Sequence, residues 1–250
     1  MRYFVAFSYF GKFYHGWQNQ PNAITVQQVM EEVFSKLLRK PVNLVGAGRT
    51  DAGVHAKQMV AHFDIEKISD TDDLIYRLNA FLPDDIAIQN IYQVSSDAHA
   101  RFDADERTYE YWVVQDKNPF AMESTHYVKH SLDLDAMNKA ASILLEYADF
   151  ECFSKSNTDV KTYLCKIKKA EWKVVDDKLI FTISADRFLR NMVRAVVGTL
   201  LDVGLGKSSI ETIREIIKSK DRGKAGVSVP AKGLYLTQVK YPKHVIENNG

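Results

Sequence analysis

Residues 46–56 read GAGRTDAGVHA, and this stretch decides how the sequence around it is interpreted. It places three glycines around Arg49 and Asp51. A tight turn explains one glycine and an aspartate that caps a local backbone N–H, but not the arginine and the other glycines. Glycine also lets another backbone or a flat ligand come close. A carboxylate beside an arginine stays ionised, ready to act as nucleophile or base. From these residues alone, a catalytic loop and a structural ion pair are equally open.

The segments on either side of this loop are predicted strands. Short apolar runs at 42–45 and 59–65 flank it, so Asp51 lies in a connection between strands and not on a helix. Further upstream, Thr25 is followed three residues later by a glutamine, which is a capping-box signal. Apolar residues then recur at helical spacing, which predicts an amphipathic helix over 26–39.

The order of the predicted elements indicates the fold class. Residues 2–10 form a strand that Gly11 and Gly16 end, and the remaining predictions are strands at 86–94, 108–114, 164–175, 179–185 and 234–241 and helices at 74–81, 134–147, 188–200 and 210–217. Strict βαβ alternation is missing, so we expect an α+β fold with a large, mainly antiparallel sheet and flanking helices. The irregular stretch 117–133 is the expected seam, which gives halves at 1–116 and 117–250.

Composition limits the class of protein. The 250 residues carry 33 basic and 32 acidic side chains, a net charge of +1, which argues against a wholesale nucleic-acid coat but leaves room for one basic face. Cys152 and Cys165 make neither a CxxC pair nor a disulfide framework, so we expect a reducing, cytoplasmic location. No apolar run reaches membrane-spanning length, and we expect no membrane partner.

Two short motifs suggest phosphate binding and metal binding, but neither motif is complete. Gly206-Lys207-Ser208 resembles the end of a phosphate-binding loop, but Leu201 stands where its first glycine belongs, and a capping box from Ser208 to Glu211 explains the segment better. His126 and His130 have a spacing that could bind metal, but nothing nearby completes a ligand set. We therefore expect no metal.

Basic and aromatic residues gather in two places. Arg101, Phe102, Arg107, Tyr109 and Tyr111 are close in sequence, and an aromatic ring there could stack on a nucleic-acid base. The alternative is that Tyr109 and Tyr111 are half-buried residues of a sheet, which is the commoner role of strand tyrosines. In the helix predicted at 188–200, the preceding residue Arg187 together with Arg190 and Arg194 falls at +3 and +4 spacing. This spacing predicts one basic ridge, either a solvated helix face or a set of phosphate contacts.

The loop and several other stretches of the sequence resemble a known protein family. GRTDAGVHA at 48–56 is similar to the signature loop of the TruA-type tRNA pseudouridine synthases. Further stretches match the family pattern in the same order: YFGKFYHGWQNQP (9–21), VQQVMEE (26–32), LNAFLPDDIAI (78–88), HARFDADERTYEY (99–111), FLRNMVRAVVGTLLDVG (188–204) and AKGLYLTQVKYP (231–242). The resemblance covers nearly the whole chain. It implies a pseudouridine-synthase-like fold with two similar α/β halves around a central cleft.

The resemblance also implies roles for individual residues. Asp51 matches the catalytic aspartate and Arg49 the arginine implicated in flipping the target nucleotide. Tyr109 matches the tyrosine that packs on the uracil, and Leu234 an apolar residue of the same pocket. The segment 98–102, with His99, Arg101 and Phe102, matches a part of the family that contacts tRNA. The implied protein is a homodimer without metal or organic cofactor that acts on uridines 38, 39 and 40 of the tRNA anticodon stem-loop.

Two departures and several alternatives stay open. The stretch 152–165 matches the family only loosely, so the resemblance does not assign tRNA contacts to Lys155 or Lys161. Arg190-Asn191 stands where some members carry histidines. Asp51 could attack C1′, add to C6 of the ring or remove a sugar proton. The rival functions are a non-catalytic RNA-binding protein on the same scaffold and an N-glycosylase that releases free uracil.

Overall fold

The computed structural model describes residues 1–155 and 160–246, which pack into two compact units. The first unit contains Met1–Glu106 and the chain from Tyr235 onward. The second unit contains Arg107–Leu234. The last strand therefore returns to the unit in which the chain begins. The predicted halves, 1–116 and 117–250, follow sequence order instead, and as functional halves they remain a prediction.

The first unit is built on a mainly antiparallel sheet. β1 (Arg2–Tyr9) pairs antiparallel with β3 (His55–Asp64) on one side and with β4 (Ile86–Val94) on the other. The short β2 (Val45–Gly46) adds to β3. β9 (Leu234–Lys240) also adds to β3, but in parallel, through His55 with Tyr235 and Ala56 with Leu236.

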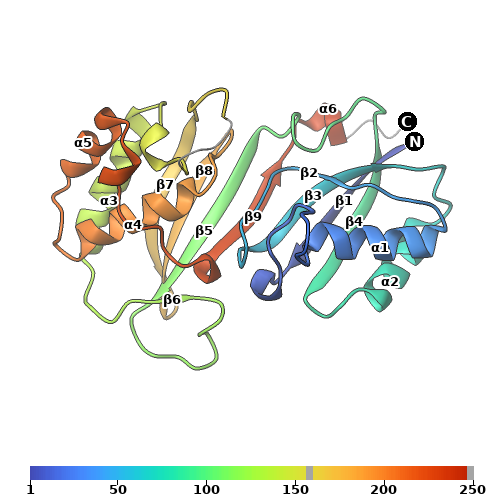
Figure 1. Cartoon of the computed structure of the whole chain (residues 1–250), viewed down its shortest axis with the longest axis horizontal. Coiled ribbons are helices and arrows are strands. Elements are labelled where there is room, and N and C mark those ends of the chain that lie inside the picture. The colour runs from blue at the N-terminus through green and yellow to red at the C-terminus, as the bar shows by residue number, and fades with distance from the viewer. Residues whose placement is uncertain (156–159, 247–250) are drawn as a thin grey trace. The chain divides into compact units, whose positions relative to one another are not determined.

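Two helices cover one face of this sheet (Figure 1). α1 (Val26–Leu38) begins where Thr25 accepts a hydrogen bond from the Gln28 N–H at 3.3 Å, so the predicted cap is confirmed. α2 (Thr71–Phe81) is capped in the same way by Asp70. Their apolar stripes meet the alternate apolar residues of the strands in a core that includes Phe7, Met30, Phe34, Phe63 and Leu74, all fully buried. The short α6 (Lys243–Ile246) follows β9.

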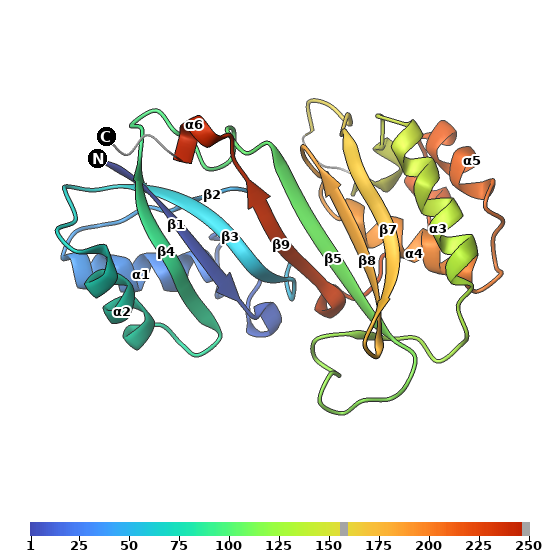
Figure 2. The same ribbon diagram turned by 180° about the vertical axis from the view of Figure 1, so that it is seen from behind.

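The second unit is built on β5 (Glu106–Val114), β8 (Lys178–Ala185) and β7 (Ile167–Val175), all paired antiparallel (Figure 2). The two-residue β6 (His126–Tyr127) runs parallel to β5. β7 and β8 form the predicted hairpin around Asp176-Asp177, and Asp176 has a φ of +53°, as a tight hairpin turn requires.

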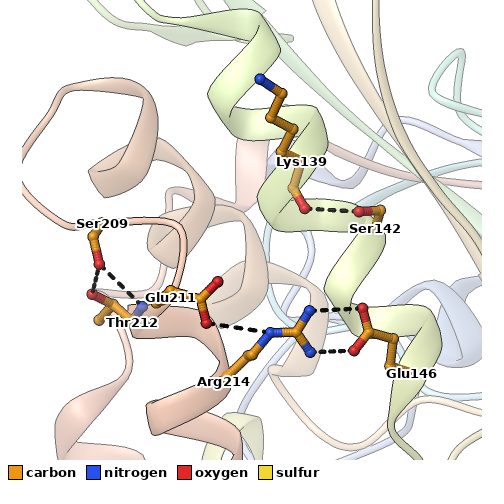
Figure 3. Close-up of polar contacts among 7 residues, drawn as sticks. All are labelled: Lys139, Ser142, Glu146, Ser209, Glu211, Thr212 and Arg214. Carbon is orange, nitrogen blue, oxygen red and sulfur yellow. Dashed lines mark hydrogen bonds and ion pairs between the residues drawn. The ribbon is translucent and has the colours of Figure 1, made fainter.

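The helices of the second unit are α3 (Leu134–Ile143), α4 (Met192–Gly204) and α5 (Thr212–Ser219). Figure 3 shows how α5 is tied to the chain that follows α3: Arg214 donates to both carboxylate oxygens of Glu146 and lies 3.4 Å from a carboxylate oxygen of Glu211. The N-cap residue of α5 is Glu211, which makes no side-chain cap hydrogen bond, and the Ser209 hydroxyl accepts from the Thr212 N–H at 3.3 Å in the turn that leads into the helix. The capping box predicted from Ser208 to Glu211 was therefore wrong.

The α+β class, the mainly antiparallel pairing and the flanking helices are thus confirmed. Within the described residues, no helix combines the length and the apolar character needed to cross a membrane.

Candidate active site

The loop between β2 and β3 holds the two residues that the sequence singled out. β3 begins at His55, four residues earlier than predicted, so the last part of the GAGRTDAGVHA stretch is already strand. Before it, the Val54 N–H bonds to the Asp51 carbonyl at 3.2 Å, and Gly53 has a φ of +76°. The chain therefore turns tightly directly after Asp51, in a conformation that favours glycine.

A second segment supports the backbone of this loop. The Trp17 N–H bonds to the Thr50 carbonyl at 3.3 Å, and the Gly53 N–H bonds to the Tyr14 carbonyl at 3.2 Å. A Cβ on Gly16, whose φ is +88°, would lie 2.3 Å from the Thr50 carbonyl oxygen. Sequence analysis treated Gly16 only as the end of a strand, whereas it is needed for this close approach.

Hydrogen bonds of buried polar side chains hold the loop and the start of β3 in place. The Tyr9 hydroxyl and the Thr50 hydroxyl are hydrogen-bonded at 2.8 Å. His55, 1% exposed, accepts at Nδ1 from the Gly11 N–H at 2.9 Å, so that nitrogen carries no proton. Its ring lies between Phe10 and Tyr235, with centroids 4.1 and 4.7 Å away. The sequence missed this support, because the contacts join segments that are far apart in the chain.

Arg49 and Asp51 lie on the accessible side of the loop. Arg49 is exposed, and Asp51 is half-buried. A Cβ added to Gly48 would meet no described atom within 4 Å. The loop thus combines an anchored backbone, a carboxylate next to a cation in sequence, and an open approach at Gly48. Such a surface can admit a flat ligand to within reach of a carboxylate.

The segment with His99, Arg101 and Phe102 is held by two histidines. The Arg101 N–H donates to His99 Nδ1 at 3.1 Å, and the Ala100 N–H donates to His62 Nδ1 at 3.1 Å. Burial lowers the pKa of His62 to about 4 and also lowers the pKa of His99, with nearby Arg2 acting in the same direction at both. Both rings are therefore neutral acceptors at physiological pH.

This segment presents a cation and an aromatic ring to solvent. Phe102 is 74% exposed, and the Arg101 guanidinium lies 5.7 Å from its ring centroid. The start of the 46–56 stretch lies beside His62, because β2 pairs Val45 with His62 and Gly46 with Ala61. Ala100 bonds to the same histidine, so the structure places this segment near the first residues of the loop. Asp51 belongs to the other end of the loop, next to the start of β3 at His55, which is seven residues along the strand from His62.

Tyr109 and Leu234 belong to the second unit. Tyr109 is partly exposed, and its ring meets Phe188 edge-on at 5.2 Å. Tyr111, on the same strand, is fully buried and donates its hydroxyl to the Pro230 carbonyl at 2.9 Å. Leu234 is 6% exposed. Of the two tyrosines, only Tyr109 keeps a ring accessible, while Tyr111 has the core role that strand tyrosines commonly have.

The basic ridge predicted along one helix was wrong. α4 begins at Met192, after Asn191, whose φ is +66°, so Arg187 and Arg190 lie in the chain before the helix. The Asn191 side chain donates to the Ser228 hydroxyl at 2.6 Å, which supports this left-handed conformation. Only Arg194 lies on α4, and its Nε donates to the Val229 carbonyl at 2.7 Å. The three arginines therefore do not lie along one helix.

The remaining candidates lie elsewhere. Within residues 1–155 and 160–246, no three His, Cys, Asp or Glu side chains are grouped so that they could hold a metal ion. Residues 156–159 of the loosely matching stretch 152–165 lie outside the described part of the chain.

Comparison with known proteins identifies the class to which this fold and loop belong. A family model described as tRNA pseudouridine synthase matches residues 5–103 and 140–242, and the chain is a member of that family. It is 52% identical over 247 residues to tRNA pseudouridine synthase A of Bacteroides thetaiotaomicron, which covers 98% of this chain and 92% of that protein.

Other relatives carry the same name. The protein from Parabacteroides distasonis is 53% identical over 245 residues, covering 98% of this chain and 97% of its own length. The protein from Acetivibrio thermocellus is 42% identical over 235 residues, covering 93% and 96%. The matched ranges contain Arg49, Asp51 and Leu234, whereas Tyr109 lies between them. The family resemblance inferred from the sequence is confirmed, and the roles of individual residues remain predictions.

Proposed function

We propose that this protein isomerises uridine to pseudouridine in tRNA, at positions 38, 39 and 40 of the anticodon stem-loop. Membership of the tRNA pseudouridine synthase family supports the reaction. The observation that carries the proposal is the geometry of the 46–56 loop. Its backbone is fixed by the 14–17 segment, Asp51 is half-buried, Arg49 is exposed, and the space over Gly48 is open.

The reaction breaks the bond between N1 of uracil and C1′ of the ribose, turns the base and joins C5 to C1′. The hydrogen on C5 leaves as a proton and N1 takes up a proton, so the product has the same composition as the substrate. Asp51 is the group that acts on the nucleotide, by attack at C1′, by addition to C6 or by removal of a sugar proton. A paired base cannot reach it, so the target nucleotide is flipped out at a cost of about a few kcal/mol.

Other residues bind and orient the RNA in this proposal. Arg49 contacts the backbone at the gap that the flipped base leaves. Tyr109 packs on the uracil and Leu234 lines the same pocket. His99, Arg101, Phe102, Arg187, Arg190 and Arg194 contact tRNA away from the reacting atoms. Contacts of this kind position the RNA and do not read its sequence, so target choice follows from tRNA shape.

We further propose a cytoplasmic homodimer with tRNA lying across both subunits, with no metal or organic cofactor. A chain with 33 basic and 32 acidic residues has little net charge of its own. Two copies can combine their basic faces into one RNA-binding surface.

The test uses unmodified tRNA with tritium at C5 of uridine. We expect the wild-type protein to release tritium into water without free uracil, and Asp51→Asn to bind tRNA while releasing none. The matched control is Asp84→Asn, which removes an exposed carboxylate elsewhere in the first unit and keeps wild-type release. Wild-type turnover by Asp51→Asn would contradict the role of this aspartate. Replacing the uridine at position 38, 39 or 40 with cytidine, one position at a time, then shows which positions are modified.

Two other outcomes identify the rival functions. Binding of tRNA without tritium release by the wild type would favour a non-catalytic RNA-binding protein. Release of free uracil, with an abasic site left in the tRNA, would identify an N-glycosylase.

A further inference from the structure

Thr50 joins Arg49 to Asp51, and it is held on two sides. Its hydroxyl is hydrogen-bonded to the Tyr9 hydroxyl at 2.8 Å, and its carbonyl accepts from the Trp17 N–H at 3.3 Å. Both partners of the hydroxyl bond are buried, with Tyr9 4% and Thr50 9% exposed. A buried hydroxyl pair is directional and shielded from water, so it fixes the backbone between the two functional residues.

An irregularity in the sheet shifts the start of β3, and the loop before it, by one residue relative to Tyr9. β1 and β3 pair residue for residue from Arg2 with Asp64 to Phe7 with Met59, and the next pair is Tyr9 with Ala56. β3 therefore contains one extra residue, a bulge, directly after the loop. In an unbroken ladder Tyr9 would lie opposite Lys57, one residue farther from the turn. Bulges are common next to active sites, and this one sets which β3 residue lies opposite Tyr9.

From this geometry we infer that the Tyr9–Thr50 hydroxyl pair positions Asp51 for the isomerisation, and that Tyr9 and Thr50 are positioning residues that set the turnover rate. Neither hydroxyl touches the substrate. They act by holding the loop backbone, and through it the carboxylate, in the reactive geometry. Displacement of a reacting group by about 1 Å can lower a rate about 100-fold. The inference rests on the proposed role of Asp51.

The test compares kcat and KM for tritium release among matched variants. Thr50→Val keeps the side-chain shape without the hydroxyl, and Tyr9→Phe removes only the other hydroxyl. We expect each to lower kcat about 10- to 100-fold, with KM changed less than about threefold. Thr50→Ser keeps the hydroxyl and restores kcat to within about threefold of wild type.

The double variant tests whether the two hydroxyls act as a pair. If they do, Tyr9→Phe with Thr50→Val lowers kcat no further than either single change. The matched control is Tyr3→Phe on the same strand. Tyr3 is 2% exposed, and its hydroxyl accepts from the Ile68 N–H at 3.0 Å. This control loses a partly buried hydrogen bond far from the loop, so its melting temperature falls while kcat stays at the wild-type value.

The outcomes separate this inference from the proposed function. If Asp51→Asn is inactive but Thr50→Val turns over at the wild-type rate with a lowered melting temperature, the hydroxyl pair is structural and the inference is overturned. If the loss of kcat in the double variant equals the product of the two single losses, the hydroxyls act independently and the inference is overturned as well. If Asp51→Asn keeps wild-type turnover, the proposed function of Asp51 fails first, and positioning by the pair fails with it.

Discussion

At the residue scale, two glycines near Asp51 serve opposite purposes. A Cβ on Gly16 would lie 2.3 Å from the Thr50 carbonyl oxygen at a φ of +88°, so Gly16→Ala must distort the loop backbone. Gly48 faces open space, so Gly48→Ala fits the folded chain. The open space matters only if something enters it, and the proposed ligand is the target nucleotide.

We therefore predict different defects for the two alanine variants. Gly16→Ala lowers the melting temperature and kcat together. Gly48→Ala keeps the melting temperature within about 2 °C of wild type but lowers kcat/KM at least about tenfold. Thermal unfolding and tritium release measure both quantities. A fully active Gly48→Ala would show that no substrate group approaches this side of the loop.

A second prediction at this scale concerns His62. Burial lowers the pKa of His62 to about 4, below the value of 6.5 in an unfolded chain. The free energy of unfolding is therefore unaffected above pH 6.5 and falls as the pH drops from about 6.5 to about 4, because the unfolded chain takes up the proton first. The full loss is on the order of 3 kcal/mol, from about 1.4 kcal/mol per pKa unit.

Urea unfolding at pH 7.5, 5.5 and 4.5 measures this dependence. In His62→Asn, an amide oxygen replaces Nδ1 as the acceptor for the Ala100 N–H. This variant should lose less stability between pH 7.5 and 4.5 than the wild type. Equal losses in the two proteins would mean that other groups, such as His99, whose pKa burial also lowers, account for the acid sensitivity.

At the scale of elements, the chain before α4 carries two of the arginines that are proposed to contact tRNA. Arg190 precedes the helix because Asn191 is left-handed. We predict that Arg190→Glu weakens tRNA binding and reduces the slope of log Kd against log salt by about 1. The control is Lys207→Glu, an exposed lysine just beyond the other end of α4, which leaves the slope unchanged. Filter binding over a salt series measures both slopes, and an unchanged slope for Arg190→Glu would remove it from the RNA interface.

The same element shows why some predictions succeeded and others did not. The cap of α1 and the hairpin at Asp176 depend on neighbouring residues, so local patterns predicted them. The start of α4 depends on Asn191 bonding to Ser228, 37 positions away, which no local pattern reveals. The site divides in the same way. The signature loop identified Arg49 and Asp51, but the support from Tyr9 and Gly16 comes from segments that meet only in the fold.

At the scale of the whole molecule, the proposed tRNA surface requires two copies of the chain. We predict that light scattering of the purified protein gives twice the mass of one chain at micromolar concentration. The same measurement with one tRNA added per dimer should show a single complex. A monomeric mass that persists with tRNA bound would contradict the proposal that the RNA lies across two subunits.

The return of β9 to the first unit has a consequence for synthesis on the ribosome. The loop with Asp51 is made early, but its strand β3 pairs with β9, and His55 packs on Tyr235, near the end of the chain. At about 5–20 residues per second, translation of the second unit delays this pairing by on the order of ten seconds. A nascent or prematurely terminated chain therefore carries its aspartate beside an unpaired strand edge, and the enzyme is assembled only after β9 has been made.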